Sequence, residues 1–198
     1  MNTVPHIFFR LFHREWYETP DRYQPSSELL QVARAVIPPT WRLYRNNKWY
    51  YVIPDEISIP KQGWKIHISA TPVNCEEVLQ AVAATCTERA TPFKFTLDRF
   101  YVTLTTSKIW PREAAGKFIT IYPKDKQDFR ELLEVLYLPL QRFTGPYILS
   151  DRRFRDSRVI YYRYGGIDDF SVLSYRGEKQ HMLVSPDGEL VRDQRAPY

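Results

Sequence analysis

The sequence predicts an α+β fold, in which helices pack on a sheet. It also predicts a single domain with at most a small appendage. The chain has 198 residues, a usual length for one domain, and hydrophobic residues make up 43% of it. Strand and helix patterns alternate over residues 61–166. Fifteen prolines against seven glycines indicate many stiff turns between these elements. A chain of this size can bury enough surface to fold without metal or disulfide cross-links.

The N-terminal part, residues 1–60, is rich in Trp, Tyr and Pro, and we expect it to form a packed subdomain. Residues 26–39 (SSELLQVARAVIPP) are typical of a helix that a serine caps and two prolines end. Residues 41–54 (WRLYRNNKWYYVIP) predict a β-hairpin with Asn46 and Asn47 at its turn.

Residues 61–166 predict the core of the domain. Asn74 and Asp125 each begin a helix with one apolar face. Residues 98–108 are ambiguous, because β-branched residues compete with a helical start at Asp98. Strand patterns cover residues 64–69, 92–96, 117–123 and 158–166.

The last segment, residues 167–198, predicts an extension with a hairpin around residues 186–188. It contains fewer apolar residues in regular patterns than the core does. We expect it to pack loosely on the core or to connect the core to a further domain.

Several classes of protein are excluded by what the sequence lacks. No apolar run approaches the roughly 18 residues that span a bilayer, and the first residues do not form a signal peptide. The sequence contains no phosphate-binding loop, dinucleotide fingerprint, zinc-protease motif, nucleophile elbow or kinase catalytic loop. We therefore expect neither a metal nor a cofactor.

The two cysteines, Cys75 and Cys86, do not form a metal-binding or redox motif. Their spacing puts both on the apolar face of the helix that Asn74 begins. Buried, reduced thiols are the expected state, which favours a cytoplasmic location.

Cationic residues recur on the polar faces of the predicted strands. Lys65 and His67 project to the same side of the strand at residues 64–69, because side chains alternate along a strand. Lys94 lies between two phenylalanines that face the other way, and Arg163 ends a similar alternation. If these faces converge, they form a rigid cationic pocket. The same pattern is also typical of a half-solvated sheet, so the residues alone leave both interpretations open.

Arginines strengthen the first interpretation. Residues 150–158 (SDRRFRDSR) contain four of them, and Arg112 precedes the strand that ends at Tyr122. The formal net charge is +5, which favours an anionic partner. Guanidinium groups hold phosphate bidentately and keep their charge, so a phosphate site is the simplest functional interpretation. Loop arginines that only contact water or acidic neighbours are the alternative.

An ordered set of motifs resembles the N-terminal lyase domain of class III and class IV lanthipeptide synthetases. The set comprises WYETPDRY, WKIHISATP, PFKF, SKxxxRxxxGKFITIYP, GPYILSDRRFRDS, YYRYGG and SPDGELVRDQRAPY. These domains are more distantly similar to the phosphothreonine lyases that bacterial pathogens inject. The resemblance implies a phosphothreonine-lyase-like fold, a mixed or antiparallel sheet with helices packed on it. It also implies β-elimination of phosphate from phosphoserine or phosphothreonine, without metal or cofactor, to give dehydroalanine or dehydrobutyrine.

The resemblance also implies roles for single residues. Lys94 matches the general base that removes the Cα proton, and His67 matches the general acid that protonates the leaving phosphate. Lys65 matches a lysine near the substrate carbonyl, where Tyr122 is a second donor to the developing negative charge. Crowding by cations and partial burial would lower the pKa of Lys94, as a base requires.

Three further matches concern the phosphate itself. Arg112 and Tyr122 match an arginine and a tyrosine with the same spacing, and Arg152 and Arg163 match two phosphate-binding arginines. Arg153 or Arg155 are alternatives to Arg152, and the role of Lys117 stays open.

The expected partners are a phosphorylated precursor peptide with its leader, and the kinase and cyclase domains of a full synthetase. The closing RAPY falls about where the kinase domain of such a synthetase would begin, so the chain is expected to be an excised or a standalone lyase domain. Neither nucleic acid nor a membrane is an expected partner. A non-catalytic module that binds the leader peptide and a single-stranded nucleic-acid binder are the rival hypotheses.

Overall fold

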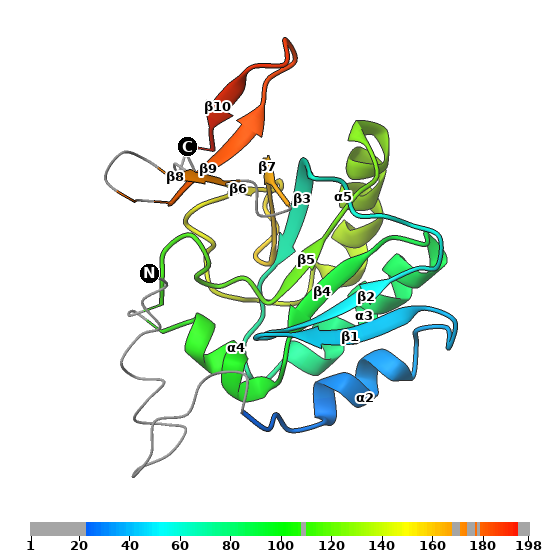
Figure 1. The fold of residues 1–198 in the computed structure, drawn as a ribbon. Helices are drawn as coiled ribbons and strands as arrows, with labels where there is room; N and C mark the ends of the chain where they lie inside the picture. Colours follow the sequence, from blue (N-terminus) through cyan, green and yellow to red (C-terminus); the bar gives the residue numbers. More distant parts are fainter. Residues whose placement is uncertain (1–22, 108–109, 168–170, 174–176, 178, 194–198) are drawn as a thin grey trace.

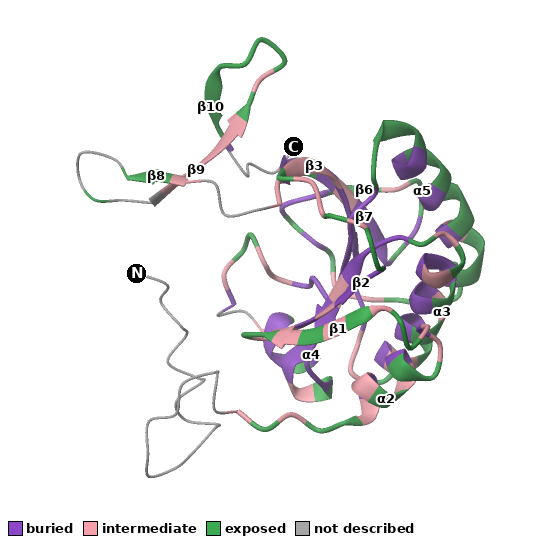
Figure 2. Ribbon diagram, turned by 45° about the vertical axis from the view of Figure 1, so that its right-hand side comes forward, coloured by how far each residue is buried: buried purple, intermediate pink, exposed green. Residues whose placement is uncertain are grey.

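The computed structural model describes residues 23–107, 110–167, 171–173, 177 and 179–193. In this part of the chain, helices cover one face of a large sheet and leave much of the other face open (Figures 1 and 2). The predicted α+β fold is thereby confirmed. The first seven residues of the WYETPDRY motif and the closing RAPY lie outside the described residues.

The large sheet has seven strands, and every neighbouring pair is antiparallel. In spatial order they are β1 (Arg42–Asn46), β2 (Trp49–Ile53), β4 (Phe93–Thr96), β5 (Ile119–Ile121), β3 (Gln62–Ile68), β7 (Ile160–Gly166) and β6 (Arg152–Arg153). A second, three-stranded sheet consists of β8 (Ser171–Leu173), β9 (Lys179–Val184) and β10 (Leu190–Arg192). Strands from residues 23–60 and from residues 61–166 therefore share one sheet.

Three helices pack on one face of the large sheet, as Figure 2 shows: α2 (Glu28–Arg34), α3 (Cys75–Glu88) and α5 (Lys126–Leu140). The predicted apolar stripe of α3 is completely buried, and both of its cysteines are free thiols. The buried face of α5 includes Phe129, Leu132 and Leu136. Across the described residues, we find no helix with the length and apolarity that a membrane span requires.

The β1–β2 hairpin is confirmed, with its turn one residue later than expected. Asn46 still pairs with Trp49, so the two-residue turn consists of Asn47 and Lys48. Asn47 has a φ of 53°, a left-handed conformation that asparagine tolerates better than most residues. The shift matters because it places Lys48 beside the open face of the sheet.

Residues 98–108, which are ambiguous in the sequence, contain the helix α4 (Arg99–Thr105) directly after β4. The competition is decided by Asp98, whose side chain accepts a hydrogen bond from the backbone N–H of Tyr101 at 2.9 Å. The same carboxylate accepts bonds from Tyr23 Oη at 2.5 Å and from the backbone N–H of Ser26 at 3.2 Å. Asp98 is completely buried, so it ties the N-terminal described residues to the core.

We expect Asp98→Ala to lower the free energy of unfolding by about 2 kcal/mol or more, because it removes a helix cap and strands two further donors. Urea denaturation followed by circular dichroism measures this change. Asp125→Ala is the matched control: Asp125 caps α5 through the backbone N–H of Asp128 alone, at 2.8 Å, and is exposed. Its loss should cost about 1 kcal/mol. Equal losses in the two variants would contradict the anchoring role of Asp98.

Candidate active site

One row of directly opposed residues crosses the open face of the large sheet. Opposed residues on antiparallel strands project to the same face, so the strand register decides which side chains meet. In order across the sheet, the row consists of Tyr44, Tyr51, Lys94, Thr120, His67, Tyr161 and Arg153. Only Thr120 separates Lys94 from His67, which places their backbones two strand spacings, or about 10 Å, apart.

A cleft of about 250 Å³ opens over the middle of this row. Besides Trp49, Ala114, Thr120, Gly166 and Ile167, its walls carry Lys48, Lys65, His67, Lys94, Glu113, Lys117, Tyr122 and Arg163. Five permanent or potential cations thus face one space together with a histidine, whereas Glu113 is the one carboxylate among the described lining residues. The sequence left open whether the polar faces of the strands meet in a pocket or face solvent; in the structure they line one space, which we call the cationic cleft.

Lys94 lies in an aromatic surrounding. Its Nζ is 4.7 Å from the ring centre of Trp49, 5.2 Å from that of Tyr51 and 5.8 Å from that of Tyr122. Nζ also lies 3.4 Å from the hydroxyl oxygen of Tyr51. None of the described carboxylates forms an ion pair with it. Burial, together with the positive charges of Lys48 and Lys117, lowers the pKa of Lys94 to about 8. A neutral amine is therefore well populated near this pH.

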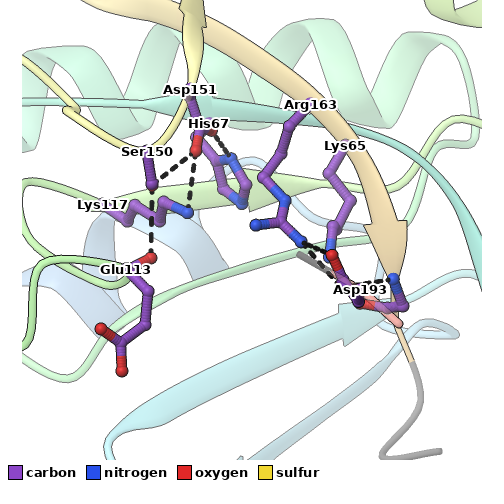
Figure 3. A network of polar contacts seen from close by, with 9 residues as sticks. Lys65, His67, Glu113, Lys117, Ser150, Asp151, Arg163 and Asp193 are labelled. Atoms are coloured by element: carbon purple, nitrogen blue, oxygen red, sulfur yellow. Dashed lines mark hydrogen bonds and ion pairs between the residues drawn. The ribbon is translucent and has the colours of Figure 1, made fainter. Parts of the chain in front are cut away.

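His67 is held by a buried carboxylate. Nδ1 of the imidazole donates a hydrogen bond to Asp151, which lies in the turn before β6. The second oxygen of Asp151 lies 3.0 Å from Nζ of Lys117, and Ser150 Oγ donates to it at 2.7 Å (Figure 3). With Nδ1 engaged, Nε2 is the ring nitrogen that can serve the cleft.

The electrostatic states of this pair follow from its neighbours. Burial and the Lys117 ammonium lower the pKa of His67 to about 3, against the opposing effect of Asp151. Burial alone would raise the pKa of Asp151, but the hydrogen bond from His67 and the positive charge of Lys117 bring it well below its usual range. Asp151 is therefore ionised, and in the free protein the imidazole is neutral.

A second carboxylate lies behind Arg163. The guanidinium Nη2 donates to both oxygens of Asp193, at 2.9 and 3.1 Å, and Lys65 donates to the carbonyl oxygen of Gly166. Figure 3 shows Lys65 and Arg163 side by side, with their charged ends directed toward Asp193. The Nε–H of Arg163 is buried without a hydrogen-bond partner among the described residues. Arg163 lines the cleft, where its guanidinium could donate to an anionic oxygen.

The structure brings five of the seven site residues expected from the sequence together: Lys65, His67, Lys94, Tyr122 and Arg163. Arg112 and Arg152 are exposed and do not line the cationic cleft. Arg152 pairs with Tyr162, whose ring packs against Phe129 of α5, so this position faces the helices. Arg153, one of the two alternatives to Arg152, pairs with Tyr161 and therefore lies on the open face.

Sequence reasoning missed Lys48, Trp49, Asp151 and Asp193. Lys48 lines the cleft because it is a turn residue of the β1–β2 hairpin. A shift of the turn by one residue would change this position. Asp151 contacts His67 across 84 residues of sequence, and Asp193 contacts Arg163 across 30, so no local spacing reveals them. The sequence contained one signal for Asp151. It is an acidic residue directly before the arginine cluster, a position that is typical of a residue in an ion pair.

Comparisons with known proteins identify the family and the fold of this chain. The sequence profile of the family described as RamC, N-terminal domain, matches residues 29–198. Over 186 residues, the chain is 35% identical to a probable SapB synthase of Streptomyces coelicolor. That match takes in 94% of this chain but 20% of the synthase, so the chain spans about a fifth of that relative's length.

Solved structures of bacterial effectors have a similar fold. The phosphothreonine lyase OspF of Shigella flexneri superposes with a TM-score of 0.52 at 16% identity, covering 80% of this chain and 84% of OspF. The VirA (SpvC) phosphothreonine lyase of Chromobacterium violaceum gives 0.51 at 17% identity, covering 80% of each chain. An effector of Pseudomonas syringae pv. tomato gives 0.53 at 14% identity, covering 85% of this chain and 74% of the effector. The phosphothreonine-lyase-like fold is thereby confirmed.

We expect Lys94→Met to stabilise the fold at pH 7 by about 1–2 kcal/mol, because it removes a charge that the folded state disfavours. Between pH 8 and 10.5, the folded protein loses the Lys94 proton while the unfolded chain retains it, so the stability of the unmodified protein rises with pH. The advantage of the variant should therefore shrink above pH 8. Urea denaturation at pH 7 and pH 10 measures it, and a constant difference would contradict the lowered pKa.

Proposed function

We propose that this chain, which belongs to the RamC N-terminal domain family, eliminates phosphate from phosphoserine or phosphothreonine in a peptide. The products are dehydroalanine or dehydrobutyrine and inorganic phosphate. One observation carries the proposal: an amine with a lowered pKa and a carboxylate-held imidazole share one face of a cationic cleft, with a single residue between them. The fold of phosphothreonine lyases supports the same reaction class.

Lys94 acts as the base in this proposal. Its neutral amine takes the hydrogen on Cα as a proton, and the electron pair of that bond forms the Cα=Cβ double bond. The Cβ–O bond breaks, and its electrons leave with the phosphate. Burial and the nearby cations Lys48 and Lys117 keep the amine partly neutral near pH 8, which suits a general base.

His67 acts as the acid. The neutral imidazole of the free protein needs a proton before the phosphate leaves. A bound phosphate carries nearly two negative charges, which favour the imidazolium and raise the pKa of His67. Substrate binding therefore supplies the electrostatic condition for protonation. Asp151 fixes the ring so that Nε2 can deliver the proton to the departing oxygen.

The remaining cleft residues stabilise charge. Burial raises the pKa of Tyr122 well above its usual value, so the hydroxyl keeps its proton and can donate to the carbonyl oxygen as negative charge develops. Lys65 serves the same oxygen. Arg163 binds the phosphate through its guanidinium, and Lys117 adds positive charge to the same cleft. Arg112 and Arg152 receive no role in the cleft.

The biological setting that we propose is lanthipeptide biosynthesis, because the S. coelicolor relative is a probable SapB synthase. A kinase domain would supply the phosphorylated precursor peptide, and a cyclase domain would consume the dehydrated residues. Two free, buried cysteines suit the reducing cytoplasm, where we place this chemistry.

Lys94→Ala and His67→Ala should each reduce elimination by about 10²-fold or more, because each removes a proton-transfer group. Mass spectrometry of a synthetic phosphoserine peptide measures the loss of one phosphoric acid. The matched control is Lys126→Ala, which removes an exposed lysine at the start of α5. Circular dichroism checks that all variants fold. Undiminished elimination by either variant would remove its assigned role. Binding of the peptide by the unmodified chain without any mass change would favour a leader-binding module instead.

Arg163→Gln should raise KM for the same peptide by about tenfold or more, because a charge-assisted hydrogen bond to phosphate is lost. Arg152→Gln, on the helix side of the sheet, should leave KM within about twofold. Initial rates over a range of peptide concentrations give both values. The opposite ranking would show that Arg152, and not Arg163, holds the phosphate.

A further inference from the structure

A second cleft adjoins the cationic cleft on the open face of the sheet. It has a volume of about 320 Å³ and lies over β1, β2 and the segment that follows β2. The two clefts share Tyr122 and Ile167 as walls. The two clefts are therefore direct neighbours on this face. We call the second space the aromatic cleft.

Most of its lining residues are apolar or aromatic, although polar atoms make up much of its exposed surface. Tyr44 and Tyr51 stack with ring centres 5.4 Å apart and an interplanar angle of 8°, and Ile57 and Ile59 are only partly buried. Arg42 is the one charged residue among the described lining residues, and its guanidinium donates to the carbonyl oxygen of Ile57 at 3.3 Å. Partly exposed isoleucines and tyrosines gain free energy when an apolar group covers them.

The strand register gives the distance between the two clefts. Tyr51 is opposed to Lys94 on one side and to Tyr44 on the other. From Lys94 to Tyr44 is therefore two strand spacings, or about 10 Å. An extended peptide advances about 3.3 Å per residue, so that distance corresponds to two or three residues.

We infer that the aromatic cleft binds an apolar side chain of the substrate peptide, two or three residues from the phosphorylated residue. The inference rests on the proposed function and adds a sequence requirement to it: an aromatic or branched aliphatic residue at that distance. The absence of a carboxylate from the described walls and the stacked tyrosines favour such a group over a basic one. Binding there would hold the peptide while Lys94 and His67 act on the phosphorylated residue.

The test uses a panel of phosphoserine peptides with alanine at every other position, in which one phenylalanine is moved from three residues before to three residues after the phosphoserine. Elimination rates of the 198-residue chain give kcat and KM for each peptide, and fluorescence anisotropy gives its affinity. We expect one position, two or three residues away, to lower KM by about tenfold relative to the all-alanine peptide. Aspartate at that position should give no such gain.

Two variants locate the preference. Tyr44→Ala and Ile57→Ser shorten walls of the aromatic cleft without touching Lys94. Both should turn over the all-alanine peptide as the unmodified chain does, while the gain from phenylalanine falls below about twofold. Leu138→Ala is the matched control, since Leu138 is an apolar residue on α5, 75% exposed, and should keep the full gain.

The outcomes separate this inference from the proposed function. Three outcomes would overturn the inference and leave the proposed function intact. The phenylalanine gain could persist in Tyr44→Ala and Ile57→Ser, aspartate could give the gain instead, or KM could be equal across the panel. If no peptide loses phosphate, the proposed function fails. The anisotropy data then still test whether the aromatic cleft binds an apolar side chain. Tighter binding of one phenylalanine peptide, lost in Tyr44→Ala, supports this binding, and equal affinities refute it.

Discussion

The alternation of side chains along one antiparallel sheet is the constraint on which this molecule depends. Phenylalanines and isoleucines of β3, β4 and β5 face the helices and are completely buried. The residues between them, Lys94, Thr120 and His67, face the open side in one row. A slip of one residue between two strands would exchange the two sets, placing a lysine in the core and a phenylalanine in the cleft. The energy of core packing therefore also fixes the geometry of the candidate site.

Concentrating positive charge in so small a space has a cost, and two buried carboxylates reduce it. Asp151 lies between His67 and Lys117, and Asp193 lies against Arg163. Without them, like charges at such distances would repel one another in a region of low dielectric constant. Lys94 receives aromatic rings instead of a carboxylate. This difference fits the proposed division of labour, in which Lys94 must lose its charge whereas Lys117 and Arg163 must keep theirs.

How much the sequence could predict depended on the range of each interaction. The helices α3 and α5 follow from apolar periodicity and capping residues, which are local signals. The convergence of Lys65, His67, Lys94 and Arg163 could be anticipated because period-two alternation on separate strands puts each on a polar face. The resemblance to lanthipeptide synthetases then suggested which roles those residues have. Tyr122 was expected for the same reason, and it lines the cleft.

What could not be predicted lies at turns and in long-range pairs. The exact position of the hairpin turn puts Lys48 in the cleft, and register with β7 sends Arg152 toward α5 and Arg153 toward the open face. One residue of offset decides each of these outcomes, and periodicity alone does not define it. Partners such as Asp151 and Asp193 depend on how distant segments pack, which no local pattern contains.

The Asp193 contact has a consequence for turnover. This carboxylate follows β10, yet it accepts from Arg163 and, at 3.3 Å, from the backbone N–H of Gly166. If Arg163 binds phosphate as proposed, Asp193 competes for the same guanidinium and weakens the binding of product phosphate as well as that of the substrate. An enzyme that bound its small inorganic by-product too firmly would stall after one cycle. In the proposed reaction, the three-stranded sheet would thus influence, through this single acid, how readily the anion departs.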